Sequence, residues 1–270
     1  LYHGWKFNGD GQCVEQPGEL DRPFCEKVRI RSYPVEMYRG LVFAYLGEGE
    51  PPPFPRYPEF EGEGVEEPRV YERHCNYFNS MDNCLDEVHV AFTHQTAFNR
   101  IKEIPVINIE RTEFGAVSHC PRPGKGVRVT EFLMPNVTRL KSPSPDPAVR
   151  WADYIVWRVP IDDASHYGFG THFIKLTGDV RRRYLERKAQ TEALPEPPLQ
   201  ELAERVLSGR ATLEEVKAGM GPRDPHYDVY LEDHVVLGGQ GIVADRDNEV
   251  LGAADAGVVA VRDLWEEELG

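Results

Sequence analysis

A proline-, glycine- and glutamate-rich stretch at residues 47–68, GEGEPPPFPRYPEFEGEGVEEP, most limits what this chain can fold into. Proline fixes φ and removes a backbone donor, so the stretch cannot continue a helix or a sheet. We interpret residues 51–68 as a linker between a small domain at 1–50 and a larger one at 69–270. The alternative interpretation is a long surface loop within a single domain.

The residues before the linker read as short strands and turns. The segment NGDG at 8–11 is a turn signal between two short extended runs. The segment KVRIRSYPVEMYRGLVFAYLG alternates in polarity and predicts two strands joined at Arg39-Gly40. We therefore expect the first domain to consist of strands and turns.

The residues after the linker combine helical and strand patterns. Helices are predicted at 76–94, 194–209, 211–219, roughly 223–240 and 256–269. Strands are predicted at VINIERTEF, GVRVTEFLM, DYIVWRVPI and YGFGTHFIKL, all within residues 105–176. Thr212 and Glu215 form a capping box at the start of one of the helices. Helices around a central antiparallel sheet predict an α+β fold.

Charge and cysteine usage exclude several classes of partner and location. Acidic residues outnumber basic ones by 45 to 31, for a formal charge of −14. Nucleic acids and anionic membrane surfaces need a basic face, so we expect neither as a partner. No apolar run approaches the roughly 18 residues of a membrane-spanning helix. The five cysteines form no C-x-x-C pair, which favours reduced thiols in a cytoplasmic protein.

Four polar residues near the start of the larger domain carry the clearest chemical pattern: Asn83, Asp86, His89 and His94. On a continuous helix their side chains would lie within an arc of about 140°. Two imidazoles and a carboxylate suit a divalent transition metal such as iron or zinc. The gap between the two histidines is wide for an undistorted helix, so we expect a bulge or a helix end between them.

The histidine pair still lacks a third ligand. Two histidines and one carboxylate with open positions form the arrangement of non-haem iron oxygen chemistry. Spacing alone does not choose among the distant candidates Asp228, Glu232, Asp233, Asp245 and Asp247. Two other functions stay open from these residues. One is a zinc hydrolase with a metal-bound water, and the other is a non-catalytic helix-grip domain in which the histidines are structural.

Three stretches of the chain carry a family resemblance. LYHGWKF at residues 1–7 resembles the second half of a Rieske iron–sulfur motif. Asn83-x2-Asp86-x2-His89-x4-His94 resembles the mononuclear-iron motif of the same family, and the tail at 240–262 is also similar. Together these stretches resemble the α subunits of Rieske non-haem iron aromatic ring-hydroxylating oxygenases, particularly the phthalate-dioxygenase-like branch.

The resemblance implies a role for each matching residue. His89 and His94 would bind the catalytic Fe(II), and Asp233, in YLEDHVV, matches the place of the carboxylate ligand better than Glu232. His3 would bind the [2Fe–2S] cluster. Asn83 would lie behind the iron ligands and support them.

Asp86 would not be a ligand in this family. The matching aspartate bridges a cluster histidine of one subunit to an iron-bound histidine of the next, and so carries electrons between the metal centres. Because that contact crosses subunits, the resemblance implies a homo-oligomer, commonly a trimer.

The resemblance also implies a fold and an activity. An all-β Rieske domain would be followed by a helix-grip, START-like catalytic domain whose central antiparallel sheet is flanked by helices. The protein would be the terminal oxygenase of aromatic-compound breakdown, a monooxygenase or dioxygenase that hydroxylates or oxidatively demethylates an organic substrate with O2. Electrons would come indirectly from NAD(P)H through a reductase or ferredoxin.

The chain departs from the family pattern at its first residues. Its sequence begins at Leu1 and contains no Cys-x-His, so three of the four cluster ligands are absent from it. We therefore expect the chain to be the later part of a longer protein; the alternative is a protein that has lost the cluster site. As written, it should bind no Rieske cluster.

Substrate-facing positions are harder to predict from the sequence. Phe132, Met134, Trp157 and Phe169 lie on predicted strands and are candidates to line an apolar pocket, although such residues are more often plain core. Residues 181–183, three consecutive arginines, are predicted to be a solvated turn or a patch that faces a partner.

Overall fold

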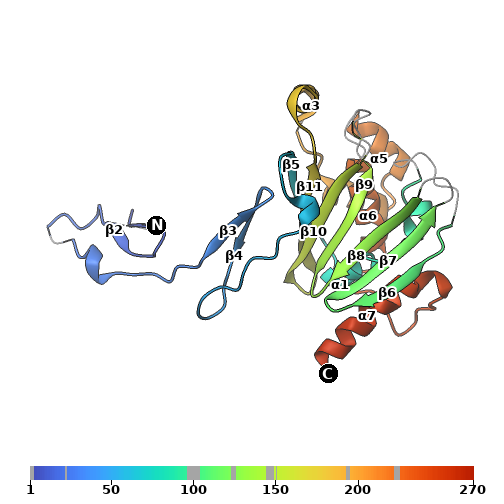
Figure 1. The fold of residues 1–270 in the computed structure, drawn as a ribbon, viewed down its shortest axis with the longest axis horizontal. Coiled ribbons are helices and arrows are strands. Elements are labelled where there is room, and N and C mark those ends of the chain that lie inside the picture. The colour runs from blue at the N-terminus through green and yellow to red at the C-terminus, as the bar shows by residue number, and fades with distance from the viewer. Residues whose placement is uncertain are drawn as a thin grey trace. The chain divides into compact units, whose positions relative to one another are not determined.

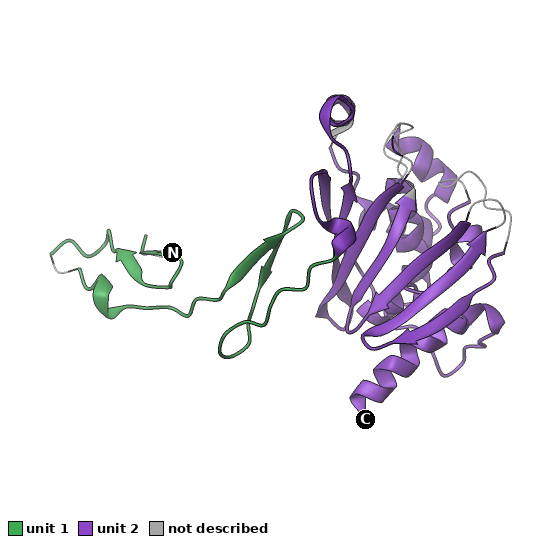
Figure 2. Ribbon diagram, in the orientation of Figure 1, with its two compact units in different colours: residues 1–57 green, residues 58–270 purple. Residues whose placement is uncertain are grey.

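The computed structural model describes residues 3–21, 23–95, 104–122, 126–143, 149, 151–192, 195–221 and 226–270. The chain divides into two compact units, Leu1–Tyr57 and Pro58–Gly270 (Figure 2). This division falls within the predicted linker, but the linker prediction extends too far toward the C-terminus. Strand β5 (Val65–Arg73) already belongs to the sheet and contains Pro68. Proline is tolerated there because β5 is an edge strand, which has one unpaired side.

The first unit contains two hairpins and a short 3₁₀ helix at Cys25–Lys27. β1 (Lys6–Phe7) pairs with β2 (Cys13–Glu15), and β3 (Val35–Tyr38) pairs with β4 (Leu41–Ala44). The turn between β3 and β4 lies at Arg39 and Gly40, whose φ values are 49° and 78°. Two positive φ values in a two-residue loop are typical of a type I′ hairpin turn, so the predicted turn is confirmed.

The second unit is built on a seven-stranded antiparallel sheet with the order β5-β11-β10-β9-β8-β7-β6 (Figure 1). The remaining strands are β6 (Asn108–Thr112), β7 (Gly115–Arg122), β8 (Gly126–Leu133), β9 (Val137–Pro143), β10 (Trp151–Asp162) and β11 (Ser165–Ile174). The sequence patterns predict β6, β8, β10 and β11. They miss β5, β7 and β9, in which charged residues, proline or glycine interrupt the apolar alternation.

Seven helices accompany the sheet in the described residues: α1 (Tyr77–Asp82), α2 (His89–Phe92), α3 (Gly178–Glu192), α4 (Leu199–Leu207), α5 (Leu213–Met220), α6 (His226–Gly239) and α7 (Ala256–Leu269). α6 passes behind the strands in the view of Figure 1, and α7 packs on β6, β7 and α1. The predicted α+β fold with a central antiparallel sheet is therefore confirmed. None of the described helices is both long and apolar enough to cross a membrane.

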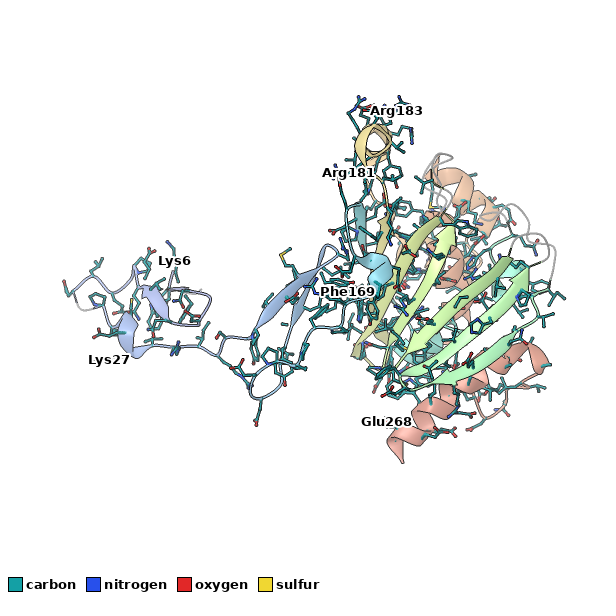
Figure 3. All side chains as sticks on the ribbon, in the orientation of Figure 1. Lys6, Lys27, Phe169, Arg181, Arg183 and Glu268 are labelled. Carbon is teal, nitrogen blue, oxygen red and sulfur yellow. The ribbon has the colours of Figure 1, made fainter. Side chains whose placement is uncertain are left out.

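Two helix predictions need correction, and one cap is confirmed. The continuous helix predicted at 76–94 is interrupted, because α1 ends at Asp82 and α2 begins at His89. The three arginines 181–183 lie on helix α3, where Figure 3 labels two of them, and not in a turn. The sequence of α3 is too uniformly charged to produce a helical apolar pattern. The capping box of Thr212 and Glu215 is present at the start of α5.

Strand alternation decides which side chains face α6. Thr130, Leu140, Tyr154 and His172 are cross-strand neighbours on β8, β9, β10 and β11, so they form one row on a single face. Trp157 and Phe169 differ from this row by an odd number of positions and therefore lie on the opposite face.

Helix α7 is fixed to α1 by charge and by close packing. Both carboxylate oxygens of Asp82 accept hydrogen bonds from Arg262, each at 2.9 Å, and Arg246 donates a further bond at 3.0 Å. Gly257 lies so close to the loop after α1 that an added Cβ would be 2.1 Å from the carbonyl oxygen of Leu85. The next residue is Asp86, so the packing of α7 positions the loop that leads to the histidine pair.

Substitution of Gly257 by alanine should therefore destabilise the protein. The new methyl group meets backbone, which cannot rotate away, and we expect a loss of about 1–3 kcal/mol in the free energy of unfolding measured with urea. Gly219 on α5 is a matched control, because an added Cβ meets nothing within 4 Å there. Gly219→Ala should be neutral or stabilise by up to about 1 kcal/mol. Equal effects of the two substitutions would contradict the packing argument.

A buried histidine joins the sheet to α1. His166 on β11 is fully buried, and its two ring nitrogens lie 2.8 Å from the carbonyl oxygen of Cys75 and 2.9 Å from Oγ of Ser80. Burial, followed by the nearby positive charge of Arg73, lowers the pKa of His166 from 6.5 to about 4. The ring is therefore neutral in the folded protein at pH 7.

This lowered pKa makes stability depend on pH. The unfolded chain binds a proton that folded His166 does not, so its contribution is complete above pH 6.5 and is lost as the pH falls toward 4. We expect the free energy of unfolding to fall by about 2 kcal/mol from this residue between pH 7 and pH 5. Urea titrations at both pH values should show a smaller fall in His166→Gln. His119→Gln, at a half-exposed position on β7, should keep the wild-type fall, and an unchanged fall in His166→Gln would contradict the prediction.

Candidate metal centre

The loop between α1 and α2 positions the two histidines. Oδ1 of Asp86 accepts hydrogen bonds from the backbone N–H groups of Val88 and His89, at 2.9 and 3.2 Å, and so fixes the backbone where α2 begins. α2 ends at Phe92, which places the predicted helix end between His89 and His94. Their rings lie nearly perpendicular, at 81°, with centroids 5.1 Å apart.

Asp233 on α6 completes a group of three potential ligands. One ligand atom from each of His89, His94 and Asp233 lies within 4.8 Å of the other two. Oδ1 of Asp233 is 3.3 Å from Nε2 of His94. Of the distant acids considered from the sequence, Asp233 is the one in this group.

Glu232 contacts the same histidine from the other side. Its Oε2 is 2.7 Å from Nδ1 of His94, and its Oε1 accepts a hydrogen bond from Lys217 on α5. A carboxylate on one ring nitrogen fixes the tautomer and the orientation of the other nitrogen. From the sequence, Glu232 and Asp233 are alternative candidates for the carboxylate ligand. In the structure each of them contacts a different ring nitrogen of His94. The adjacent acidic pair was the available signal, but spacing alone did not reveal this division.

Opposite charges set the protonation of the group. Burial opposes a proton on His94, but Asp233 and then Glu232 outweigh it and raise the pKa of His94 to about 9. Burial also opposes ionisation of Asp233, yet His94, Arg73 and His89 together lower its pKa well below the usual range. Nη2 of the buried Arg73 is 3.8 Å from Oδ2 of Asp233. The carboxylate is therefore held in its anionic form.

Asp86 lies beside the other histidine. Its Oδ2 is 3.5 Å from Nδ1 of His89, and both side chains are partly exposed, at 25% and 17%. Burial acts to raise the pKa of Asp86. The hydrogen bond with His89 and the charge of that ring have the opposite effect and are stronger together, so the pKa of Asp86 is lowered. Asn83 ends α1 and lines the same cavity as the histidines.

The donor set fits a divalent transition metal. Two imidazole nitrogens and one anionic oxygen suit iron, and their spread of 4.8 Å or less lets them converge on one ion at ordinary bond lengths. Nδ1 of His89 is buried and lies 3.5 Å from Oδ2 of Asp86. Three protein ligands leave coordination positions open for other molecules.

A cavity of about 120 Å³ lies against the three ligands. Its other walls come from β8, β9, β10 and β11 and from α6, which contributes His226, Val229 and Tyr230 at helical spacing with Asp233. The four apolar residues named as candidates for a pocket, Phe132, Met134, Trp157 and Phe169, are not among its lining residues. Phe132 is fully buried in a core cluster instead, and Met134 packs on that cluster.

Polar side chains line this cavity to an extent that the sequence analysis missed. Five of the lining residues are polar and come from strands: Arg128, Thr130, Ser142, Arg158 and His172. Their arrangement depends on strand register, which a single sequence pattern does not reveal.

His3 lies in the first unit and is exposed. It belongs to no group of three potential metal ligands within the described residues. Trp5 next to it packs edge-on against Phe24, with ring centroids 5.5 Å apart. The residues present therefore do not make up a complete [2Fe–2S] site.

Comparison with known proteins gives a consistent set of relatives. No protein-family model matches the chain. It is 27% identical to the 5,5'-dehydrodivanillate O-demethylase oxygenase subunit of Sphingobium sp. (strain NBRC 103272 / SYK-6), over 97% of this chain and 58% of that protein. It is 32% identical to the phenoxybenzoate dioxygenase subunit alpha of Ectopseudomonas oleovorans, over 62% of this chain and 47% of that protein. The chain thus spans about half the length of these curated relatives.

Solved structures agree on the fold. NdmA of Pseudomonas putida CBB5 superposes with a TM-score of 0.60 at 15% sequence identity, over 98% of this chain and 69% of that one. The named relatives are oxygenase subunits, and one ligand atom from each of His89, His94 and Asp233 lies in a common group in this chain. The chain is therefore similar to oxygenase subunits over nearly its whole length and shares the fold of NdmA, as the resemblance to the Rieske non-haem iron oxygenases implies.

Proposed function

We propose that this chain carries the mononuclear-iron centre of a terminal oxygenase, which uses O2 and externally supplied electrons to hydroxylate or oxidatively demethylate an aromatic or related organic substrate. The observation that carries the proposal is the convergence of His89, His94 and Asp233 beside a cavity. The names of the relatives, an O-demethylase and a dioxygenase, support both types of outcome.

Each residue of the site has a distinct task in this proposal. His89, His94 and Asp233 hold Fe(II), which when bound supplies the activation of O2. Glu232, itself held by Lys217, fixes the ring of His94 through Nδ1. Arg73 keeps Asp233 ionised and in place, since a carboxylate ligand must be deprotonated to bind metal. The buried walls of the cavity limit the access of water.

Electrons must come from outside the described residues, because they contain no complete cluster site. We propose a ferredoxin or reductase as the partner, with NAD(P)H as the indirect source. Asp86 is the partly exposed carboxylate beside His89, which supports a role in passing electrons to the iron. A contact there with another subunit would require the homo-oligomer that the family resemblance implies. All five cysteines are free thiols, which supports a reducing compartment such as the cytoplasm.

Metal analysis tests the centre directly. After anaerobic reconstitution with Fe(II), we expect about one iron per chain, with most of it lost in His89→Ala and in Asp233→Ala, because each removes one of three ligands. Glu232→Gln should weaken iron binding by about 10–100-fold, since it alters the group that orients His94. Elemental analysis of the desalted proteins measures all three.

His119→Ala is the control for these variants, because His119 lies on β7 away from the group and should leave the iron content unchanged. A chain that selects zinc over iron, and that shows no oxygen uptake in the complete enzyme with its electron donor, would favour a zinc hydrolase over the oxygenase.

Asp86 can be tested separately from metal binding. Asp86→Asn keeps an oxygen that can accept from the backbone of Val88 and His89 but removes the charge beside His89, so we expect unchanged iron content and turnover reduced about tenfold or more. Oxygen consumption by the complete enzyme with its electron donor measures turnover. Asp86→Ala also removes the two hydrogen bonds to the backbone of Val88 and His89. Turnover near the wild-type value in Asp86→Asn would exclude the electron-transfer role.

A further inference from the structure

A second cavity, of about 490 Å³, is lined by residues of β5, α4 and α6 and of the segment before α4. Its volume lies within the range of about 300–1,000 Å³ that is usual for small-molecule sites. Tyr71 and Tyr230 line both this cavity and the metal-site cavity, so the two cavities are neighbours. The three potential metal ligands do not line the second cavity, and the proposed function gives it no task.

Tyrosine rings give the second cavity an aromatic surface. Tyr71 and Tyr230 pack on one another with ring centroids 5.4 Å apart, and Tyr227 lies one helical turn before Tyr230 on α6. The face of an aromatic ring attracts cations. One such contact is already present in the cavity, because the guanidinium of Arg69 lies 4.7 Å from the centre of the Tyr227 ring.

Carboxylates outnumber cations around the same space. The charged side chains that line it are four glutamates and one arginine: Glu72, Glu196, Glu201, Glu204 and Arg69. His74 lies between two of these glutamates, 3.2 Å from Glu72 and 3.3 Å from Glu204. Among the described residues, no cation forms an ion pair with either of the other two, Glu196 and Glu201.

Glu196 brings the negative charge to the aromatic surface. Its Oε1 accepts a hydrogen bond of 3.3 Å from the hydroxyl of Tyr227. A cation beside this carboxylate would therefore also lie near the rings. Such a cation would gain both a charge-assisted hydrogen bond and the attraction of the aromatic groups.

The carboxylates of this cavity are too far apart to hold a metal ion. Within the part of the chain that the structure describes, His89, His94 and Asp233 are the only three potential ligands close enough to share one ion. An aromatic, negatively charged cavity without converging ligands favours a positive charge that is carried by an organic group.

We propose that the second cavity binds a small protonated arylalkyl amine, with its ammonium group at Glu196 and its ring on the tyrosine surface. The rings favour a ligand with an aromatic part over the side chain of a lysine from another protein. This inference goes beyond the proposed function, because it concerns a ligand and a cavity that the metal centre does not use.

The test compares benzylamine, which is protonated at pH 7, with benzyl alcohol, which has a similar shape but no charge. Isothermal titration calorimetry on the metal-free chain excludes coordination of the amine to iron. At low ionic strength we expect benzylamine to bind at least about fivefold more tightly than benzyl alcohol. About 0.5 M NaCl should reduce this preference, because the glutamates are exposed to solvent and salt screens their charge.

Two variants locate the site. In Glu196→Gln the preference for benzylamine should fall to within about twofold, because the carboxylate is gone. Tyr227→Leu should weaken benzylamine binding about threefold or more, because one ring face is removed. Glu214→Gln is the matched control, since Glu214 is an exposed acid on α5 that does not line the cavity, and it should keep the wild-type preference.

Several outcomes would overturn the assignment. In the unsubstituted chain these are equal binding of the two probes, binding of neither at about 10 mM, or a preference that salt does not reduce. A preference that survives in Glu196→Gln, or that is lost in Glu214→Gln, would place the amine elsewhere. Tighter binding of Nα-acetyl-lysine amide than of benzylamine would reject an arylalkyl amine as the ligand. Iron content is measured separately, so its loss would reject the proposed function and leave this inference unaffected.

Discussion

The buried guanidinium of Arg73 connects the elements that carry the metal centre. From edge strand β5 it donates a 2.7 Å hydrogen bond to Ser80 on α1, lies 3.8 Å from Asp233 on α6, and lies 5.0 Å from the centre of the Tyr71 ring. A buried charge is stable only with such partners, and the removal of one leaves the others uncompensated. The histidine pair follows α1 in the chain and the carboxylate lies on α6. Arg73 is therefore one of the contacts that fix their relative position.

Two acidic residues near Arg73 have different tasks at His94, one on each ring nitrogen. Asp233 presents its oxygen to the side of His94 where a metal would bind, while Glu232 holds the opposite nitrogen. Consecutive residues on a helix point about 100° apart, so each of the two carboxylates can reach a different edge of one imidazole. Lys217 in turn keeps Glu232 in place.

The sequence reveals the parts of this site that lie close together in the chain, and it misses those that depend on tertiary structure. His89 and His94 stand out because their spacing is local, and Asp233 follows from the family resemblance. The α+β class follows from strong helical and strand patterns. The position of Glu232 depends on the approach of α5, and the polar lining of the cavity depends on the register of β8, β9, β10 and β11, which no local pattern encodes. Pro68 was likewise predicted to lie in the linker, because proline interrupts regular structure. In the fold it lies in β5, an edge strand in which proline is tolerated.

Two positions without side chains determine much of the shape of the cavity. On β11, a Cβ at Gly168 would lie 2.1 Å from the Tyr71 ring, and one at Gly170 would lie 2.8 Å from the Tyr154 hydroxyl. Both tyrosines line the cavity, and their rings occupy the space that a side chain at Gly168 or Gly170 would fill. Efforts to alter the range of accepted compounds should therefore trim the tyrosine rings and leave β11 untouched. A methyl group on that strand would push a ring into the very space that a ligand needs.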